Sequence, residues 1–139
     1  MIENTLNETQ KILFRQNKVI DYAYEFNNRR FRINIYMIYK GYGMAIRLIN
    51  DNVKPIENFY QQKVLRDILH NDNGLILICG ATGTGKSTTL ASMIEYINQN
   101  KSKHIITLEE PIEYVFTNKK SLIHQREYHV DFENFSEAI

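Results

Sequence analysis

The spacing of apolar residues changes along the chain, and each change predicts a different kind of element. Apolar and polar side chains alternate with a period of two over residues 21–49, which is typical of strands that bury one face. Asn27-Asn28 marks a turn, and Gly41 and Gly43 break the pattern a second time. The sequence therefore predicts a small antiparallel meander, preceded by a helix whose capping box would be Thr5–Glu8.

The second part of the chain has a different order of elements. Asn50–Pro55 is polar, holds a proline and has no period, so we expect a linker there. The order that follows alternates between helices and strands, which favours an α/β fold with a parallel sheet. The expected elements are a helix that stops near Asn71–Gly74, a strand at Leu75–Cys79 buried on both faces, a helix at Lys86–Asn100, a strand at His104–Leu108, short strands at Tyr114–Phe116 and Leu122–His124, and a helix that starts near Asn134.

The segment Gly80–Ser87 reads GATGTGKS and fits the phosphate-binding loop pattern G-x-x-x-x-G-K-[ST]. Its glycines let the backbone turn with its N–H groups inward, and the helix that follows directs its positive end to the same place. Lys86 would supply a mobile charge for the β and γ phosphates, and Ser87 a hydroxyl for Mg²⁺. The alternative is a glycine-rich turn without a ligand, but the strand before the loop and the helix after it favour nucleotide binding.

A second candidate for chemistry is the acidic segment after the strand at His104–Leu108. Glu109, Glu110 and Glu113 lie at the carboxyl end of that strand, where open α/β sheets bind their ligands. Such carboxylates can hold a metal through water, or position and deprotonate an attacking water. An acidic loop with a proline turn would give the same pattern, and the residues alone leave both interpretations open.

Composition and charge exclude several classes of protein. The chain has 139 residues and a formal net charge of +1, so no overall field attracts it to nucleic acid or to an anionic membrane. No apolar run approaches the ~18 residues of a membrane span, and the start lacks the features of a signal peptide. The single cysteine, Cys79, excludes a disulfide framework and is expected to be a buried thiol. The histidines, which are His70, His104, His124 and His129, lack metal-ligand spacing.

The meander also admits a rival interpretation, because its aromatic residues interleave with basic ones. Such a surface can stack the bases of single-stranded nucleic acid. The alternation, however, puts Phe31 on the same face as Ile33 and Ile35, and Arg32 on the other. We therefore expect these aromatic side chains to form core, and we expect no nucleic-acid partner.

Several blocks of the sequence, in the right order from about Ile20 to the last residue, resemble the hexameric secretion ATPases of type II secretion and type IV pilus assembly and retraction. The block Gln125–Glu127 is more similar to the pilus-retraction, or twitching motility, branch. The matching blocks are Arg30–Asn34, Lys40–Gly43 and Arg47, Gly80–Leu90, Thr107–Glu113, Gln125–Glu127 and Phe135–Ala138.

The resemblance implies a fold and a division into domains. Residues 1–50 would be the end of a small α+β PAS-like domain, residues 51–56 a linker, and residues 57–139 the first half of a P-loop, RecA-like ATPase domain with a parallel sheet. The Walker B strand and the histidine-bearing segment of the family do not occur in the sequence. We therefore expect a fragment that binds ATP weakly and hydrolyses little of it alone, whereas the full-length protein would be an ATP hydrolase.

Carried over to this sequence, the resemblance implies a role for individual residues. Glu113 would activate or orient water, with Glu110 and Glu109 supporting the metal site beside Ser87. Arg32 and Arg47 match arginines that close over the phosphates. The residues implied to hold ATP and Mg²⁺ are Gly80, Ala81, Thr82, Gly83, Thr84, Gly85, Lys86, Ser87 and Thr88.

This sequence departs from the family pattern at two positions. Glu110 stands where the family usually has Asp, which keeps the charge and lengthens the reach. Lys40 stands where an Arg is common, so the charge remains but bidentate contact with phosphate is lost.

The resemblance also implies partners and a location. A homo-hexamer is expected, docked on inner-membrane platform proteins of a pilus or secretion machine, in the cytoplasm or at the inner face of the cell membrane. Two alternatives to pilus retraction remain open. One is a non-catalytic nucleotide-binding module that uses ATP occupancy for assembly, and the other is a type II secretion, pilus-extension or DNA-uptake ATPase of the same family.

Overall fold

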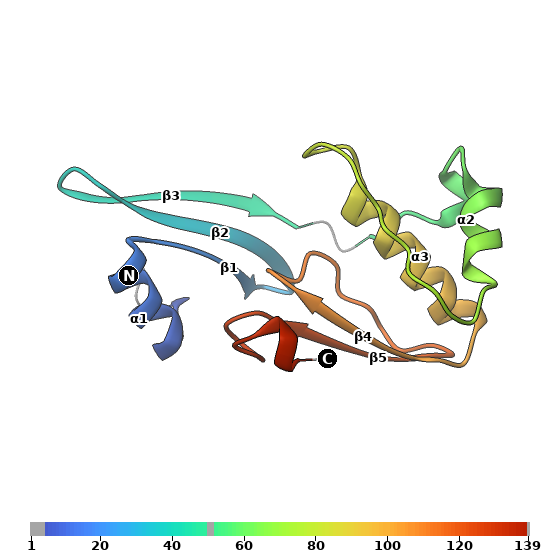
Figure 1. The fold of residues 1–139 in the computed structure, drawn as a ribbon. Helices are drawn as coiled ribbons and strands as arrows, with labels where there is room; N and C mark the ends of the chain where they lie inside the picture. Colours follow the sequence, from blue (N-terminus) through green and yellow to red (C-terminus); the bar gives the residue numbers. More distant parts are fainter. Residues whose placement is uncertain (1–4, 50–51, 139) are drawn as a thin grey trace. The chain divides into compact units, whose positions relative to one another are not determined.

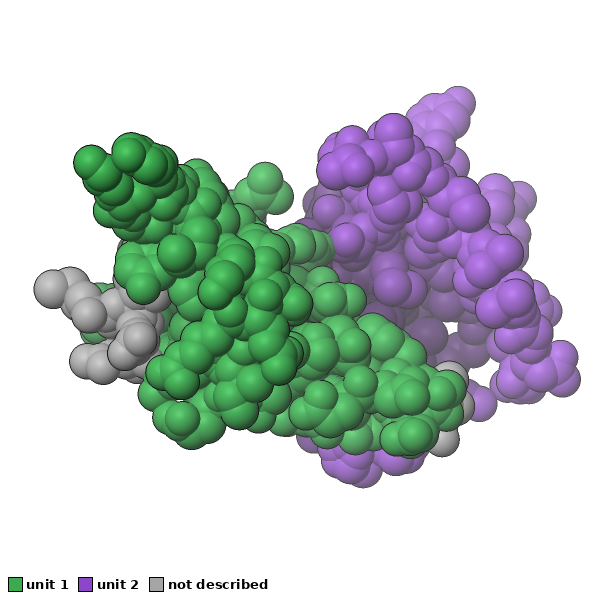
Figure 2. Space-filling model, turned by 60° about the vertical axis from the view of Figure 1, so that its left-hand side comes forward, with its two compact units in different colours: residues 1–51, 107–113, 125–139 green, residues 52–106, 114–124 purple. Residues whose placement is uncertain are grey.

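The computed structural model describes residues 5–49 and 52–138, which form two compact units (Figures 1 and 2). Unit 1 consists of residues 1–51, 107–113 and 125–139, and unit 2 of residues 52–106 and 114–124. The chain passes from unit 1 to unit 2 within the predicted linker, whose residues Asn50 and Asp51 lie outside the described part. Because later segments also belong to unit 1, the domain bounds at 1–50 and 57–139 stay a prediction.

Unit 1 contains the predicted antiparallel meander. Its strands are β1 (Val19–Phe26), β2 (Arg29–Ile38) and β3 (Gly41–Leu48), hydrogen-bonded in the order β1-β2-β3 (Figure 1). Asn27 and Asn28 connect the first two strands with φ of 51° and 56°. Two successive residues with positive φ are the requirement of a type I′ hairpin turn, and asparagine tolerates that conformation better than most residues. The prediction of a meander is confirmed.

The helix before the meander is capped by other residues than the sequence suggests. Helix α1 (Glu8–Asn17) begins after Asn7, whose side-chain oxygen accepts from the backbone N–H of Gln10 at 2.8 Å. The side chain of Gln10 in turn accepts from the N–H of Asn7 at 2.9 Å. The expected box at Thr5–Glu8 is therefore wrong, and the hydroxyl of Thr5 instead shares a 2.7 Å hydrogen bond with that of Tyr22.

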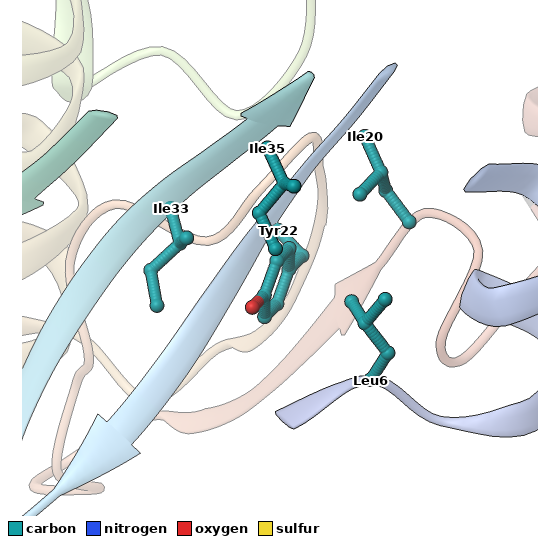
Figure 3. Close-up of a cluster of buried hydrophobic side chains, with 5 residues drawn as sticks. All are labelled: Leu6, Ile20, Tyr22, Ile33 and Ile35. Carbon is teal, nitrogen blue, oxygen red and sulfur yellow. The ribbon is translucent and has the colours of Figure 1, made fainter. Parts of the chain in front are cut away.

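The core of unit 1 lies on one face of the meander, between the sheet and the segment that enters α1 (Figure 3). Tyr22 is 2% exposed, and the aromatic rings of Tyr24 and Phe31 pack against the cluster, so these three rings belong to the core as expected. The expectation is wrong for the other aromatic residues of the meander, which are exposed: Phe26, Tyr36, Tyr39 and Tyr42. The buried residues of this cluster are Leu6, Ile20, Tyr22, Ile33 and Ile35.

Burial on this face does not extend to the third strand, contrary to the prediction. Met44, Ile46 and Leu48 of β3 point to the same face as Ile33 and Ile35 but are 45%, 59% and 53% exposed. An apolar cavity of about 310 Å³ opens there, with Thr5, Phe26, Phe31, Met44 and Ile46 among its lining residues. Periodicity identifies the apolar face of a strand, whereas burial requires a neighbour that covers it.

Gly43 lies inside β3, although the sequence pattern predicted that this glycine would interrupt a strand. It pairs with Tyr36 of β2, and a Cβ atom at position 43 would lie 2.3 Å from Cε2 of that ring. The aromatic ring thus covers the bare backbone, which compensates for the missing side chain of a glycine in a strand.

Unit 2 is built around its longest helix, α3 (Lys86–Asn100), whose bounds agree with the prediction. The helix expected after the linker is divided into a 3₁₀ turn, η2 (Ile56–Asn58), and α2 (Gln62–Leu69). Ile56, Leu69 and Met93 form the buried cluster that joins the three elements. Apolar spacing thus predicts the inward position of Ile56, but Tyr60 and Val64 of the same apolar spacing are 99% and 57% exposed. It also does not predict the break between Asn58 and Gln62.

Within the described residues, a second sheet is formed by β4 (His104–Glu109) and β5 (Leu122–Glu127). The N–H of Leu122 donates to the carbonyl of Lys103, and that of Tyr128 to the carbonyl of Glu109, both at 2.9 Å. Both partners advance by six residues in the same direction, so the pairing is parallel. The fold class predicted from the alternation of strands and helices is confirmed.

Two of the expected strands are absent from the described residues. Leu75–Cys79 forms no helix and pairs with no strand of the described chain, and Leu75 and Leu77 are 83% and 73% exposed. Tyr114–Phe116 is likewise irregular. Near the end, the expected helix is one 3₁₀ turn, η3 (Phe135–Glu137), capped by the side chain of Asn134.

Candidate functional site

The phosphate-binding loop pattern occupies the turn that leads into α3. Gly83 and Gly85 adopt φ of 82° and 92°, which is the left-handed region that glycine enters without steric cost. Gly85 is the N-cap of α3, and its carbonyl accepts from the N–H of Thr89 at 2.8 Å. The loop therefore ends at a helix N-terminus, where backbone N–H groups and the helix dipole favour an anion.

Lys86 is folded back over the start of the loop. Its ammonium group donates to the carbonyls of Gly80 and Ala81, both at 2.9 Å, while the hydroxyl of Thr84 donates to Ala81 at 2.8 Å. A Cβ at Gly80 would lie 2.7 Å from that hydroxyl, so this position has no room for a side chain. The loop thus holds one cation on carbonyl dipoles alone, and a bound phosphate could offer that cation a full negative charge.

Thr88, one turn into α3, is connected to a residue that the sequence analysis did not select. Its hydroxyl lies 3.1 Å from that of Tyr114, and its carbonyl accepts from the hydroxyl of Ser92 at 2.9 Å. Ser92 also donates to the carbonyl of Lys54 and is 1% exposed. These contacts fix the first turns of α3 against the segment that precedes η2, while the side chain of Ser87 stays exposed.

The three carboxylates after β4 have different surroundings. Glu109 is half-buried and accepts from the hydroxyl of Thr107 at 2.7 Å, from Gln125 at 3.1 Å and from the N–H of Glu113 at 3.4 Å. Glu110 is exposed. Glu109 is therefore oriented by donors on several sides, which fits a carboxylate that supports a metal site through other groups.

Glu113 forms an ion pair with Arg32, one of the arginines implied by the resemblance. The guanidinium NH1 lies 3.2 Å from Oε1 of Glu113, and its remaining edge binds both oxygens of Asp21 at 2.8–3.1 Å. The hydrogen bonds to Asp21 raise the pKa of Arg32 above its ordinary value. Burial opposes this rise, and the negative charges of Asp21, Glu113 and Glu110 add to it.

Arg47 lies directly opposite Arg32 in the register of β2 and β3. It is exposed, and within residues 5–49 and 52–138 its side chain has no ion pair. Like charges at facing positions repel, so the pairing of Arg32 with two carboxylates is what makes this arrangement tolerable. The structure thus brings Arg32, Arg47 and Glu113 together within unit 1.

The most buried ion pair of unit 1 was not predicted from the sequence. Arg30, two positions before Arg32 on the same face of β2, binds the buried Glu127 at 2.8 Å. The same carboxylate oxygen accepts from the backbone N–H of Ile112 at 3.1 Å. The alternation that places Arg30 beside Arg32 is the signal that was available, but nothing local points to a partner 97 positions away.

The predicted site residues are divided between the two units. The loop residues, from Gly80 to Thr88, belong to unit 2, whereas Arg32, Arg47 and the three glutamates belong to unit 1. Each group is therefore a separate structural finding, and their joint action on one nucleotide is a proposal.

Other candidate residues fall outside these two groups. Cys79 is exposed, so the expectation of a buried thiol is wrong. Its position in the unpaired segment before Gly80 explains the exposure. His104 and His124 face each other across β4 and β5, with Nε2 and Nδ1 3.1 Å apart. No third His, Cys, Asp or Glu joins them among the described residues, and two ligands are fewer than the three or four that a protein zinc site provides.

No helix in the described part of the chain is long and apolar enough to cross a membrane.

Taken with its position before α3 and its left-handed glycines, the loop defines an α/β protein of the phosphate-binding-loop class. The chain belongs to the family described as type II/IV secretion system protein, whose model matches residues 14–138. The resemblance to the secretion ATPases is thereby confirmed.

The relatives found by sequence include proteins of the pilus-retraction branch. A twitching motility protein of Neisseria gonorrhoeae is 39% identical over 140 residues, which cover 100% of this chain and 37% of that protein. The type IV pilus retraction ATPase PilT of Pseudomonas aeruginosa is also 39% identical, over 100% of this chain and 41% of its own length. The chain spans about two fifths of the length of these curated relatives.

Solved structures agree with this assignment. A crystal structure of the pilus retraction motor PilT with bound ADP matches with a TM-score of 0.89 at 40% identity, over 99% of this chain and 40% of that one. The ATPase DotB of Legionella pneumophila matches with a TM-score of 0.84 at 27% identity, over 99% of this chain and 40% of its own. The fold and the branch of the family expected from the sequence are both confirmed.

Proposed function

We propose that this chain binds ATP with Mg²⁺ and that the protein is an ATPase that powers type IV pilus retraction or a related secretion machine. The observation that carries the proposal is the loop before α3, where two left-handed glycines precede a lysine that only carbonyl oxygens hold. Membership of the secretion family and the similarity to a retraction motor with bound ADP support it.

Within the loop, each residue has a proposed role. Lys86 exchanges its two carbonyl partners for the β and γ phosphates, because a charged acceptor binds an ammonium group more strongly than a neutral one. Ser87 supplies a hydroxyl for Mg²⁺, which otherwise keeps water and phosphate ligands. The backbone of the remaining loop residues surrounds the phosphates with N–H groups. The metal, when bound, neutralises charge that develops on the transferred phosphoryl group.

The charged residues of unit 1 have proposed roles in hydrolysis. Glu113 orients or deprotonates the attacking water, and Glu109 and Glu110 support the metal through water. Arg32 and Arg47 stabilise negative charge on the phosphates. The donors that fix Glu109 favour a supporting role for it, and the exposed position of Arg47 leaves that cation free for an anion.

The finer assignment of partners and place is also part of the proposal. We propose a homo-hexamer that acts in the cytoplasm on inner-membrane proteins of the pilus or secretion machine, with closure around ATP as the step that moves one domain against another. The alternative of a non-catalytic module, in which nucleotide occupancy alone controls assembly, differs in one respect: it needs the loop but not Glu113.

The loop is tested by changing its lysine. Lys86→Ala removes the ammonium group and should weaken the binding of a fluorescent ADP analogue by about 10- to 100-fold, the usual loss for a hydrogen bond to a charged group. Lys63→Ala removes an exposed lysine of α2 and serves as the matched control. Equal affinity of the Lys86→Ala variant and the unchanged protein in this titration would refute nucleotide binding by the loop.

A further inference from the structure

Two arginines on the same face of β2 bind two carboxylates, one in the segment after β4 and the other at the last residue of β5. Arg30 contacts Glu127 at 2.8 Å and Arg32 contacts Glu113 at 3.2 Å. The first pair is the more buried, with side chains 20% and 8% exposed, against 33% and 38% for the second. Solvent screens the second pair more strongly, so the two contacts differ in how easily they part.

The two arginines also differ in how many carboxylates they bind. Arg32 has a second carboxylate, Asp21, to which it donates from two nitrogens. Arg30 has Glu127 as its one ion-pair partner in the described chain. Arg32 can therefore release Glu113 and remain paired, whereas release of Glu127 would leave the mostly buried guanidinium of Arg30 without an ion-pair partner.

Glu127 also binds the backbone beside Glu113. Its Oε2 accepts from the N–H of Ile112 at 3.1 Å, and Ile112 is 8% exposed. On the other side of Glu127, its own N–H donates to Asp131 at 2.8 Å. The backbone N–H of Glu113 itself donates to Glu109 over a longer distance, 3.4 Å. One carboxylate oxygen thus ties the residue before Glu113 to the meander through Arg30.

We propose that Glu127 is a positioning residue for Glu113. With Arg30 it fixes the backbone of the acidic segment on β2, while Arg32 and Glu113 exchange partners during the reaction. In this arrangement the Glu127–Arg30 pair holds the backbone of Glu113 in place, while the carboxylate of Glu113 is free to move away from Arg32. The inference rests on the proposed function, in which Glu113 orients the attacking water. That task requires Glu113 itself to be held in position.

Two substitutions separate this role from general stability. Glu127→Gln keeps an oxygen for the N–H of Ile112 but removes the charge that Arg30 binds, and Glu127→Ala removes both. Glu137→Gln changes an exposed carboxylate near the end of the described chain and is the control. Thermal melts identify any variant that does not fold.

The first measurement is amide hydrogen exchange on the full 139-residue chain. We expect Glu127→Ala to accelerate exchange at Ile112 by at least tenfold, Glu127→Gln to accelerate it by less than threefold, and the amides of β1 to be unchanged. Affinity for a fluorescent ADP analogue should stay within twofold in both variants, because the loop is intact. If the unchanged protein did not bind the ADP analogue, the proposed function would be refuted. This outcome is distinguishable from a failure of the positioning role, which is measured by amide exchange.

The second measurement is the steady-state rate of ATP hydrolysis. It uses the full-length protein, which is expected to hydrolyse ATP at a measurable rate. We expect Glu127→Ala to lower kcat by at least tenfold with KM for ATP unchanged, and Glu127→Gln to restore most of kcat. Unchanged exchange at Ile112 in a folded Glu127→Ala variant would overturn the proposal. Faster exchange throughout unit 1, or equal losses in kcat for both variants, would also overturn it, because either indicates a merely structural role.

Discussion

Arg32 and Glu113 are 81 positions apart in the sequence and form an ion pair in unit 1. Each is a candidate for a different task, since Arg32 would stabilise phosphate charge and Glu113 would activate water. Because both side chains are about one third exposed, the pair contributes no more than about 1 kcal/mol to stability. A contact of this strength parts readily when a phosphate or a water competes for either partner.

Replacement of Glu113 distinguishes an ATPase from a nucleotide-binding module. Glu113→Gln keeps the size of the side chain but cannot accept a proton, so hydrolysis should fall by about 10²–10⁴-fold, the usual contribution of a general base. Affinity for nucleotide should stay within a few-fold, since the loop is unchanged. The rate is measured by phosphate release and the affinity by fluorescence titration. If the Glu113→Gln variant hydrolysed ATP at an unchanged rate, a residue other than Glu113 would activate the attacking water.

Asn98 should be one of the most sensitive positions of α3. It is 0% exposed, and its amide donates to Glu95 and to the carbonyl of Thr117 and accepts from the N–H of Lys119, at 2.9–3.0 Å. Asn98→Ala leaves buried polar groups without partners and should lower the free energy of unfolding by about 2–3 kcal/mol. Asn100→Ala, on the exposed part of the same helix, should cost about 0.5 kcal/mol or less. Urea unfolding measures both.

Glu95 should make stability depend on pH in the acid range. Burial raises the pKa of Glu95, but hydrogen bonds from Lys119, Asn98 and Gln99 outweigh it and lower the pKa below its ordinary value. The charged side chain therefore stabilises the fold above the unfolded pKa of about 4.3, and this contribution disappears as the pH falls through the lowered value. Glu95→Gln should be less stable than the unchanged protein at pH 7, and the difference should shrink toward pH 3.

That comparison has an internal control. Glu137→Gln changes a carboxylate whose surroundings are exposed, so its unfolding curves should follow those of the unchanged protein over the whole range. A difference between Glu95→Gln and the unchanged protein that stays constant from pH 7 to pH 3 would contradict the assignment.

The two glycines of β3 should respond in opposite directions to the same substitution. Gly41→Ala meets no atom within 4 Å and should be neutral or stabilise by about 0.5 kcal/mol, because glycine is entropically unfavourable in a strand. Gly43→Ala drives a methyl group into the ring of Tyr36 and should destabilise by about 1 kcal/mol, the lower end for overpacking. In a Tyr36→Ala background the cost of Gly43→Ala should vanish, which thermal melts of the double variant would show.

Local patterns predict much of the fold for a physical reason. The meander and α3 follow from side-chain periods of two and of three to four, which arise from backbone geometry within each element. The loop before α3 could be predicted equally well, because the residue types that bind phosphate lie next to one another in the sequence. The roles of Arg32 and Glu113 were implied by the family resemblance alone and stay a prediction.

Features that depend on distant partners could not be predicted. Leu75–Cys79 has the composition of a buried strand, but a strand also needs neighbours to bond, and no described residue provides them. The apolar positions of β3 are open for the same reason, since their pattern carries no information about what covers them. Arg30 and Glu127 meet across 97 positions, so no window of sequence contains both.

The exposure of Cys79 has a practical consequence. It is the single cysteine of the chain and immediately precedes the first glycine of the loop. A maleimide dye would therefore attach at one position without any prior mutagenesis, directly beside the place where nucleotide is proposed to bind. The natural sequence thus carries its own site for a spectroscopic reporter, whose emission could follow occupancy of the loop in real time.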